Sequence, residues 1–198
     1  METRMDKRKA QTKEKIFLAA VELFLQQGFD RTTVEQITEK ADVAKGTFFN
    51  HFPSKIDVLF YLSEQRMTLM EDLLERKLKK IKSAREKIYV WLKVFAEKNE
   101  ENKDIVMLVV KEAFKLEFSQ MKPEKEVRTK FIFKLLDIIK EGQEMLEFRN
   151  DFDPYLAADL LMSMYYFTLF QWLEGDLSRT LTEEYLSRAE IILSGIRR

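Results

Sequence analysis

The sequence contains no cysteine, one histidine, three prolines and five glycines in 198 residues. Without cysteine, the chain has no disulfide, no thiolate metal site and no cysteine nucleophile. The single histidine, His51, excludes a histidine-rich metal centre and leaves little for catalytic-triad chemistry. Few glycines and prolines favour long helices over a turn-rich sheet protein. We therefore expect an all-α protein of about nine helices, with no catalytic residues, metal or cofactor.

Charge of neither sign is in excess, because 34 Lys and Arg balance 34 Asp and Glu. Overall charge therefore does not indicate a nucleic-acid partner. Residues 7–15 carry five basic side chains and one acidic one, so a basic arm ahead of the first helix could reach DNA. A solvated, disordered start explains the same residues. No apolar signal segment is present near residue 1, which predicts a cytoplasmic protein.

The stretch from Thr32 to Lys55 reads as two short helices joined by a tight turn. Thr33 is a good helix N-cap, and Gln36 three residues later completes a capping-box pattern. Asp42 falls at the turn, where Asp tolerates the left-handed conformation better than most residues. Pro53 disfavours helical geometry at the residue before it and so ends the second helix.

The outward face of the second helix is unusual for a purely structural helix. Phe48 and Phe52 can point to a core, while Phe49 would expose apolar surface and Gly46 weakens the helix by roughly 1 kcal/mol. Both residues make sense if DNA packs there, since Gly allows close approach and an aromatic ring covers sugar or a thymine methyl. No acidic residue lies between positions 43 and 55, which suits a phosphate backbone. The alternative is a plain helical hairpin that caps a core.

Residues 45–55 read KGTFFNHFPSK, and this segment resembles the recognition helix of the TetR family of bacterial transcriptional repressors. The resemblance implies a three-helix DNA-binding domain with a helix-turn-helix, followed by a larger helical domain for ligand binding and dimerisation. It also implies that the outward side chains contact mostly phosphates. The candidate DNA-binding residues are Thr33, Lys45, Gly46, Thr47, Phe49, Asn50, His51 and Lys55.

The chain departs from the family pattern at three positions. Phe49 stands where the family usually has Tyr, so a hydroxyl contact to phosphate is lost. Glu35 stands where several members have a base-reading Arg. Asp42 replaces the usual turn glycine.

Apolar spacing and caps predict the remaining helices. We expect a DNA-binding domain over residues 1–53 and a ligand-binding and dimerisation domain over residues 54–198. The predicted helices cover residues 10–27, 33–41, 44–51, 54–82, 83–99, 103–118, 123–148, 154–174 and 182–196. The basic run over residues 76–87 is either a DNA patch or the favourable placement of Lys near a helix C-terminus.

The helix over residues 154–174 is apolar nearly all round, so it must be buried on several sides. Its length would allow a membrane span, but Asp159 and three other polar side chains make a poor one. We instead expect this helix and the last one to form an isologous four-helix contact in a homodimer. The candidate interface residues are Tyr166, Phe170, Leu173, Tyr185 and Ile192.

The middle helices are rich in aromatic and Met side chains, which can line an apolar cavity or simply fill a core. Few charged residues lie on their inward faces, so a hydrophobic or amphipathic small molecule is the expected effector. The candidate pocket residues are Leu62, Trp91, Phe95, Met107, Phe114, Phe131, Leu135, Met162 and Tyr165.

These patterns and the resemblance to the TetR family together predict a dimeric, ligand-responsive repressor that binds a double-stranded, near-palindromic operator. A helical adaptor that binds protein partners without DNA is the alternative, although it leaves the outward face of residues 45–51 unexplained. An enzyme is disfavoured because the sequence shows no nucleotide-binding loop, metal-ligand cluster or nucleophile–base arrangement.

Overall fold

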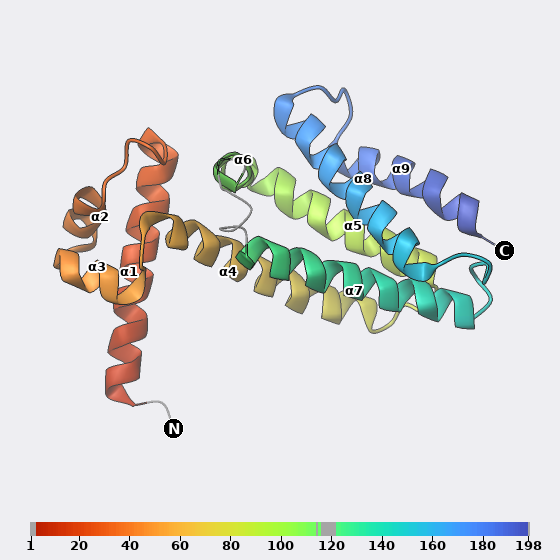
Figure 1. The fold of residues 1–198 in the computed structure, drawn as a ribbon, viewed down its shortest axis with the longest axis horizontal. Helices are drawn as coiled ribbons and strands as arrows, with labels where there is room; N and C mark the ends of the chain where they lie inside the picture. The colour runs from red at the N-terminus through yellow and green to blue at the C-terminus, as the bar shows by residue number, and fades with distance from the viewer. Residues whose placement is uncertain (1–2, 114, 116–121, 198) are drawn as a thin grey trace. The chain divides into compact units, whose positions relative to one another are not determined.

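The computed structural model describes residues 3–113, 115 and 122–197, and these residues form nine α-helices (Figure 1). The all-α prediction is confirmed, since the only β-type pairing in the described residues is an isolated bridge between Phe148 and Arg197. The helices are α1 (Arg4–Gln27), α2 (Val34–Ala41), α3 (Lys45–His51), α4 (Lys55–Leu78), α5 (Ala84–Glu101), α6 (Lys103–Ala113), α7 (Lys122–Glu144), α8 (Pro154–Glu174) and α9 (Leu181–Ile196).

By packing, the chain divides into two compact units, and α4 contributes to both. The first unit comprises residues 1–66 with residues 104–121, and the second comprises residues 67–103 with residues 122–198. This division is one of contacts, so the functional boundary at residue 54 stays a prediction.

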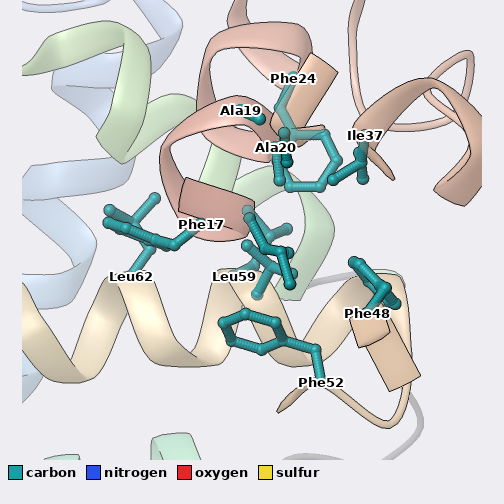
Figure 2. Packing of buried hydrophobic residues seen from close by; sticks show 12 residues of the cluster. Phe17, Ala19, Ala20, Phe24, Ile37, Phe48, Phe52, Leu59 and Leu62 are labelled. Atoms are coloured by element: carbon teal, nitrogen blue, oxygen red, sulfur yellow. The ribbon is translucent and has the colours of Figure 1, made fainter. Parts of the chain in front are cut away.

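A hydrophobic cluster formed by α1, α2, α3 and α4 holds the first unit together (Figure 2). Phe24 of α1, Ile37 of α2 and Phe48 of α3 meet in it, with Phe52 and Leu59 closing one side. All five side chains are at least 97% buried. Burying a side chain of this size contributes about 1.5–3 kcal/mol, so this cluster fixes how α3 is presented.

The turn between α2 and α3 has the geometry that the sequence predicts. Asp42 adopts the left-handed conformation, with φ 53° and ψ 53°, directly after α2. Its N–H and that of Val43 donate to carbonyl oxygens of the last turn of α2. A left-handed residue therefore closes α2 and turns the chain into α3.

In the second unit, α5 packs against α7 and α9, and α8 packs against α7 and α9 (Figure 1). The N-terminus of α5 is capped twice. Ser83 Oγ accepts the Glu86 N–H, and the Glu147 carboxylate accepts the Ala84 N–H at 2.7 Å and the Ser83 hydroxyl at 2.6 Å. A carboxylate at a helix N-terminus is favourable, so Glu147 joins the end of α7 to the start of α5.

Within the described residues, three predicted helix limits differ from the structure by four residues or more. Helix α1 begins at Arg4 rather than residue 10, because Thr3 and Asp6 form a capping box. Helix α4 ends at Leu78 rather than residue 82. Helix α7 ends at Glu144 rather than residue 148, because Leu146 turns left-handed with φ 59°. The predicted extension of α6 beyond Ala113 to residue 118 falls largely outside the described residues.

Candidate nucleic-acid interface

Thr33 lies at the N-terminus of α2 with its side chain exposed. Its Oγ1 accepts the Gln36 N–H at 3.2 Å, and Gln36 Oε1 accepts the Thr33 N–H at 2.9 Å. The predicted capping box is therefore confirmed. Gln36 also accepts a hydrogen bond from Gln27 of α1, so the start of α2 is fixed to its neighbour.

Helix α3 divides sharply into an inner and an outer face. Phe48 is fully buried and Phe52, just after the helix, is 2% exposed, whereas Phe49 is 46% exposed. The rings of Phe48 and Phe49 lie edge to face, 5.4 Å apart. Lys45, Gly46 and Asn50 are exposed, and Thr47 and His51 are half-buried. The inward and outward residues are thus those that the sequence predicts.

Gly46 has no intramolecular reason to be glycine. A Cβ built at this position meets no atom of the described residues within 4 Å, and the residue lies inside α3 with ordinary helical geometry. Glycine in a helix costs about 1 kcal/mol relative to alanine. Open space over an exposed helix face is what close approach by another molecule requires.

His51 is neutral in the free protein near pH 7. Burial lowers the pKa of its imidazole below 6.5, and Lys9 and Lys13 of α1 lower it further. These two lysines belong to the basic segment over residues 7–15, which is helical and part of α1. The expectation of an extended or disordered arm is therefore wrong for these residues, because the Thr3–Asp6 capping box starts the helix before them.

Lys55 has contacts that the sequence prediction did not include. Its ammonium donates to the carbonyl oxygens of Phe29 at 2.6 Å and Thr32 at 2.7 Å, and lies 4.2 Å from the centre of the Phe29 ring. These carbonyls belong to the loop between α1 and α2. These two carbonyl oxygens use two of the three N–H groups of the Lys55 ammonium, so a phosphate contact would have to use the third.

An acidic side chain shares the outer surface with the predicted DNA contacts. Lys45 donates a short hydrogen bond from its ammonium to the Glu35 carboxylate of α2, and both side chains are more than half exposed. The sequence singled out both positions, but their pairing depends on how α2 and α3 cross.

The predicted pocket residues fall in different parts of the molecule. Trp91, Phe95, Phe131 and Tyr165 form one aromatic cluster in the second unit, with the Trp91 and Phe95 rings stacked 4.3 Å apart. The other predicted pocket residues in the second unit, Leu135 and Met162, are also buried. Their role in a pocket stays a prediction.

The three other pocket candidates do not join this cluster. Leu62 belongs to the hydrophobic cluster of the first unit (Figure 2), and Met107, also in the first unit, is 37% exposed. Phe114 lies outside the described residues.

The predicted dimer residues are only partly at the surface. Leu173 and Tyr185 are buried within the protomer's own bundle, so the expectation that they face a partner is wrong: α8 and α9 need these side chains to pack against their own neighbours. Tyr166, Phe170 and Ile192 are half-buried.

A different set of side chains forms an exposed apolar stripe, which the sequence analysis missed. Leu156, Leu160 and Phe167 of α8 are each more than half exposed. At 100° per residue they fall within about 40° of one another around the helix. Ile191 of α9 is 75% exposed. Spacing of i, i+4 and i+11 is the signal that could have identified the stripe.

Comparison with known proteins identifies this arrangement. A sequence family described as bacterial regulatory proteins, tetR family, matches residues 16–62, which cover the second half of α1, all of α2 and α3, and the start of α4. The chain belongs to the TetR family. The HTH-type transcriptional regulator TcmR of Streptomyces glaucescens is 51% identical over 47 residues, or 24% of this chain and 21% of its own.

Two relatives of the TetR-family chain cover nearly its whole length. The fatty acid metabolism regulator protein of Bacillus subtilis is 24% identical over 178 residues, covering 90% of this chain and 92% of its own. The crystal structure of Thermus thermophilus FadR, a TetR-family transcriptional repressor in complex with lauroyl-CoA, superposes with a TM-score of 0.77 and 27% identity. That match covers 94% of this chain and 96% of FadR.

As a TetR-family protein, the chain is a DNA-binding transcriptional regulator, and its relatives are regulators rather than enzymes. The helix-turn-helix of the family corresponds to α2, the turn at Asp42 and α3. Within the described part of the chain, no helix combines the length and apolar character needed to cross a membrane.

Proposed function

We propose that this chain is a homodimeric repressor that leaves its operator when it binds a small molecule with a long apolar chain, of the fatty acyl-CoA class. The observation that carries the DNA-binding half is the outer face of α3. This face exposes a lysine, an asparagine and an aromatic ring beside a glycine with open space above it. Such a face has no use inside a monomer but suits a major groove.

The exposed stripe on α8 supports the dimer. Leu156, Leu160 and Phe167 lie along one side of α8, and Ile191 adds a strongly exposed apolar side chain on α9. Monomeric soluble proteins rarely expose such apolar surface without a partner. A two-fold partner that pairs α8 and α9 with their copies would cover it. Such a dimer would present two α3 helices to successive major grooves, about 34–36 Å apart or a multiple of that distance.

Two observations support the effector class. The Thermus thermophilus FadR structure, similar over nearly the whole chain, holds lauroyl-CoA. In the second unit, the aromatic cluster of Trp91, Phe95, Phe131 and Tyr165 supplies apolar surface for an acyl chain. The Trp91 indole N–H is buried there and has no hydrogen-bond acceptor among the described residues. A buried donor left unpaired costs about 1–3 kcal/mol, and an acyl carbonyl oxygen would relieve that cost.

The mechanism follows from population shift. A dimer exists in states that differ in the separation of its two α3 helices, and DNA favours one of them. An effector that binds another state more tightly moves the population away from the DNA-binding state, by no more than its difference in affinity for the two. The extent of release is therefore set by the coupling free energy between effector binding and DNA binding, which is typically about 1–3 kcal/mol.

Fluorescence anisotropy tests the proposal. Duplexes are first enriched from a random library with the full-length protein, and the best duplex is labelled. Lauroyl-CoA is then titrated into the protein–DNA complex, with free CoA and lauric acid as matched controls. We expect lauroyl-CoA alone to release the duplex, by about 5–150-fold in apparent affinity. Failure to enrich any duplex would contradict DNA binding, and equal effects of all three compounds would contradict the acyl-CoA assignment.

A further inference from the structure

One ion pair lies within the outer surface of the helix-turn-helix. Lys45 is the first residue of α3 and Glu35 the second residue of α2, and the Lys45 ammonium donates to Glu35 Oε1. Their side chains remain 56% and 63% exposed. The hydrogen bond from Lys45 lowers the pKa of the Glu35 carboxyl, so Glu35 is charged at neutral pH.

The pair contributes little to folding. Exposed ion pairs typically stabilise a protein by about 0–1 kcal/mol, because water and salt screen them. Glu35 also lies in the first turn of α2, where a carboxylate gains a few tenths of a kcal/mol from the helix dipole. Neither the ion pair nor the helix dipole contributes enough stability to explain an acidic residue among the predicted DNA contacts, beside Thr33 and Lys45. Its position there is costly for DNA binding, since a carboxylate repels phosphates.

We infer that Glu35 is a specificity-determining residue: by pairing with Lys45 it weakens binding to DNA of any sequence more than binding to the operator. The inference rests on the proposed DNA-binding function. Each lysine that contacts a phosphate releases condensed counterions and contributes about −0.9 to the slope of log K against log salt. A lysine held by a neighbouring carboxylate loses much of that contribution.

The operator escapes this penalty because its contacts are closer. Non-specific DNA is held mainly by phosphate contacts, so it depends on each available basic side chain. On the operator, base-edge and apolar contacts from Phe49 and Asn50 would hold α3 in the groove and keep Lys45 beside a phosphate that competes with Glu35 for its ammonium, so less of the penalty remains. Neutralising Glu35 should therefore strengthen non-specific binding more and reduce the ratio between the two affinities.

The same unit supplies a matched control pair. Lys40 of α2 donates to Glu22 of α1 at 2.8 Å, and their side chains are 35% and 52% exposed, somewhat less than those of Lys45 and Glu35. Neither residue is among the predicted DNA contacts. Glu22→Gln removes one surface carboxylate from the same domain without touching the outer face of α3.

The test measures affinity against salt concentration for wild type, Glu35→Gln and Glu22→Gln. Two labelled duplexes of equal length are used, one of random sequence and one that wild type enriches from a random library. We expect Glu35→Gln to bind the random duplex about two- to fivefold more tightly near 0.1 M salt, with a slope steeper by up to about 0.9. We expect a smaller gain on the enriched duplex and no change with Glu22→Gln.

A second background separates the pairing from simple repulsion. In Lys45→Met, Glu35→Gln should produce a smaller gain on random DNA than in wild type, because no lysine is left to release. The inference is overturned if Glu35→Gln leaves random-duplex affinity unchanged, strengthens both duplexes equally, or gives the same gain without Lys45. Circular dichroism of each variant checks that folding is intact. If wild type enriches no duplex, the proposed function itself fails before the variants are compared.

Discussion

The Lys55 ammonium lies 2.6 Å from the Phe29 carbonyl oxygen, so the first residue of α4 is tied to the loop that joins α1 to α2. The Thr32 carbonyl accepts a second bond at 2.7 Å, one residue before the N-cap of α2. In the same loop, Asp30 accepts a hydrogen bond from Lys115, which follows α6. Two lysines from distant parts of the chain therefore hold the loop that leads into the helix-turn-helix.

We expect Lys55→Met to destabilise the protein. Hydrogen bonds from a charged donor contribute about 1.5–3 kcal/mol, and the substitution leaves the Phe29 and Thr32 carbonyl oxygens without this donor. The free energy of unfolding, measured in urea, should fall by about 2 kcal/mol. Lys7→Met, at an exposed position of α1, is the control and should change it little.

The same variant tests whether Lys55 also contacts phosphate. If its main role is to hold the loop, folded Lys55→Met keeps the salt dependence of wild type on DNA. A slope flatter by about 0.9 with unchanged stability would instead assign the side chain to the DNA backbone.

Operator affinity should rise as the pH falls through the titration of His51. In the free protein its pKa lies below 6.5, because of burial and then Lys9 and Lys13. A phosphate beside the imidazole favours the charged form and raises the pKa in the complex. Binding therefore takes up a proton between these two pKa values, and affinity increases from pH 8 toward pH 6. Affinity measured at constant ionic strength should show this rise in wild type and lose it in His51→Gln. A pH-independent wild type would place His51 away from phosphate.

Phe167→Glu should abolish dimerisation without unfolding the protomer. The ring is 62% exposed on the apolar stripe of α8, so a carboxylate is tolerated in the monomer but would be buried and unpaired in the dimer, which is costly. Sedimentation velocity at micromolar concentration should show monomers. Leu18→Glu, at a similarly exposed position on α1, should remain dimeric. A dimeric Phe167→Glu would move the interface elsewhere.

Leu146→Gly should stabilise the protein. Leu146 has φ 59° and is 55% exposed, so its Cβ strains the backbone while its side chain buries little. The left-handed conformation costs a non-glycine residue about 1–2 kcal/mol, and the greater freedom of glycine in the unfolded chain offsets part of the gain. We expect about 0.5–1 kcal/mol more unfolding free energy. Leu146→Ala keeps the Cβ and should show no such gain; equal gains would implicate the exposed side chain instead.

Local signals predicted much of this fold. Thr33 with Gln36, Ser83, and Asp153 before Pro154 mark helix starts through contacts within three residues, and the structure has each cap. Gly175 ends α8 in the left-handed conformation, as the sequence indicates. The inner and outer faces of α3 also follow from helical spacing, because Phe48 and Phe52 are four residues apart and so lie on the same side.

Features that depend on distant partners were not predictable in the same way. The Glu147 cap on α5 and the Lys55 contacts join residues far apart in sequence. Tyr185 and Leu173 were predicted to lie at the dimer interface. The sequence of a largely apolar helix does not show which of its sides packs against its own bundle and which against a partner. Position 146 has a left-handed backbone but is leucine rather than glycine, so the sequence gives no signal that α7 ends there.

In the seven-residue helix α3, Phe48 packs into the core while the neighbouring Phe49 lies on the outer face, so folding and the predicted DNA contact depend on different residues. The side chains at positions 45, 46, 49 and 50 lie outside the buried cluster, and of these four only Phe49 has a printed ring contact with it, the edge-to-face packing on Phe48. A library that randomises those four positions while keeping Phe48 and Phe52 should therefore yield folded variants with new operator preferences. The chain is a suitable scaffold for orthogonal genetic switches.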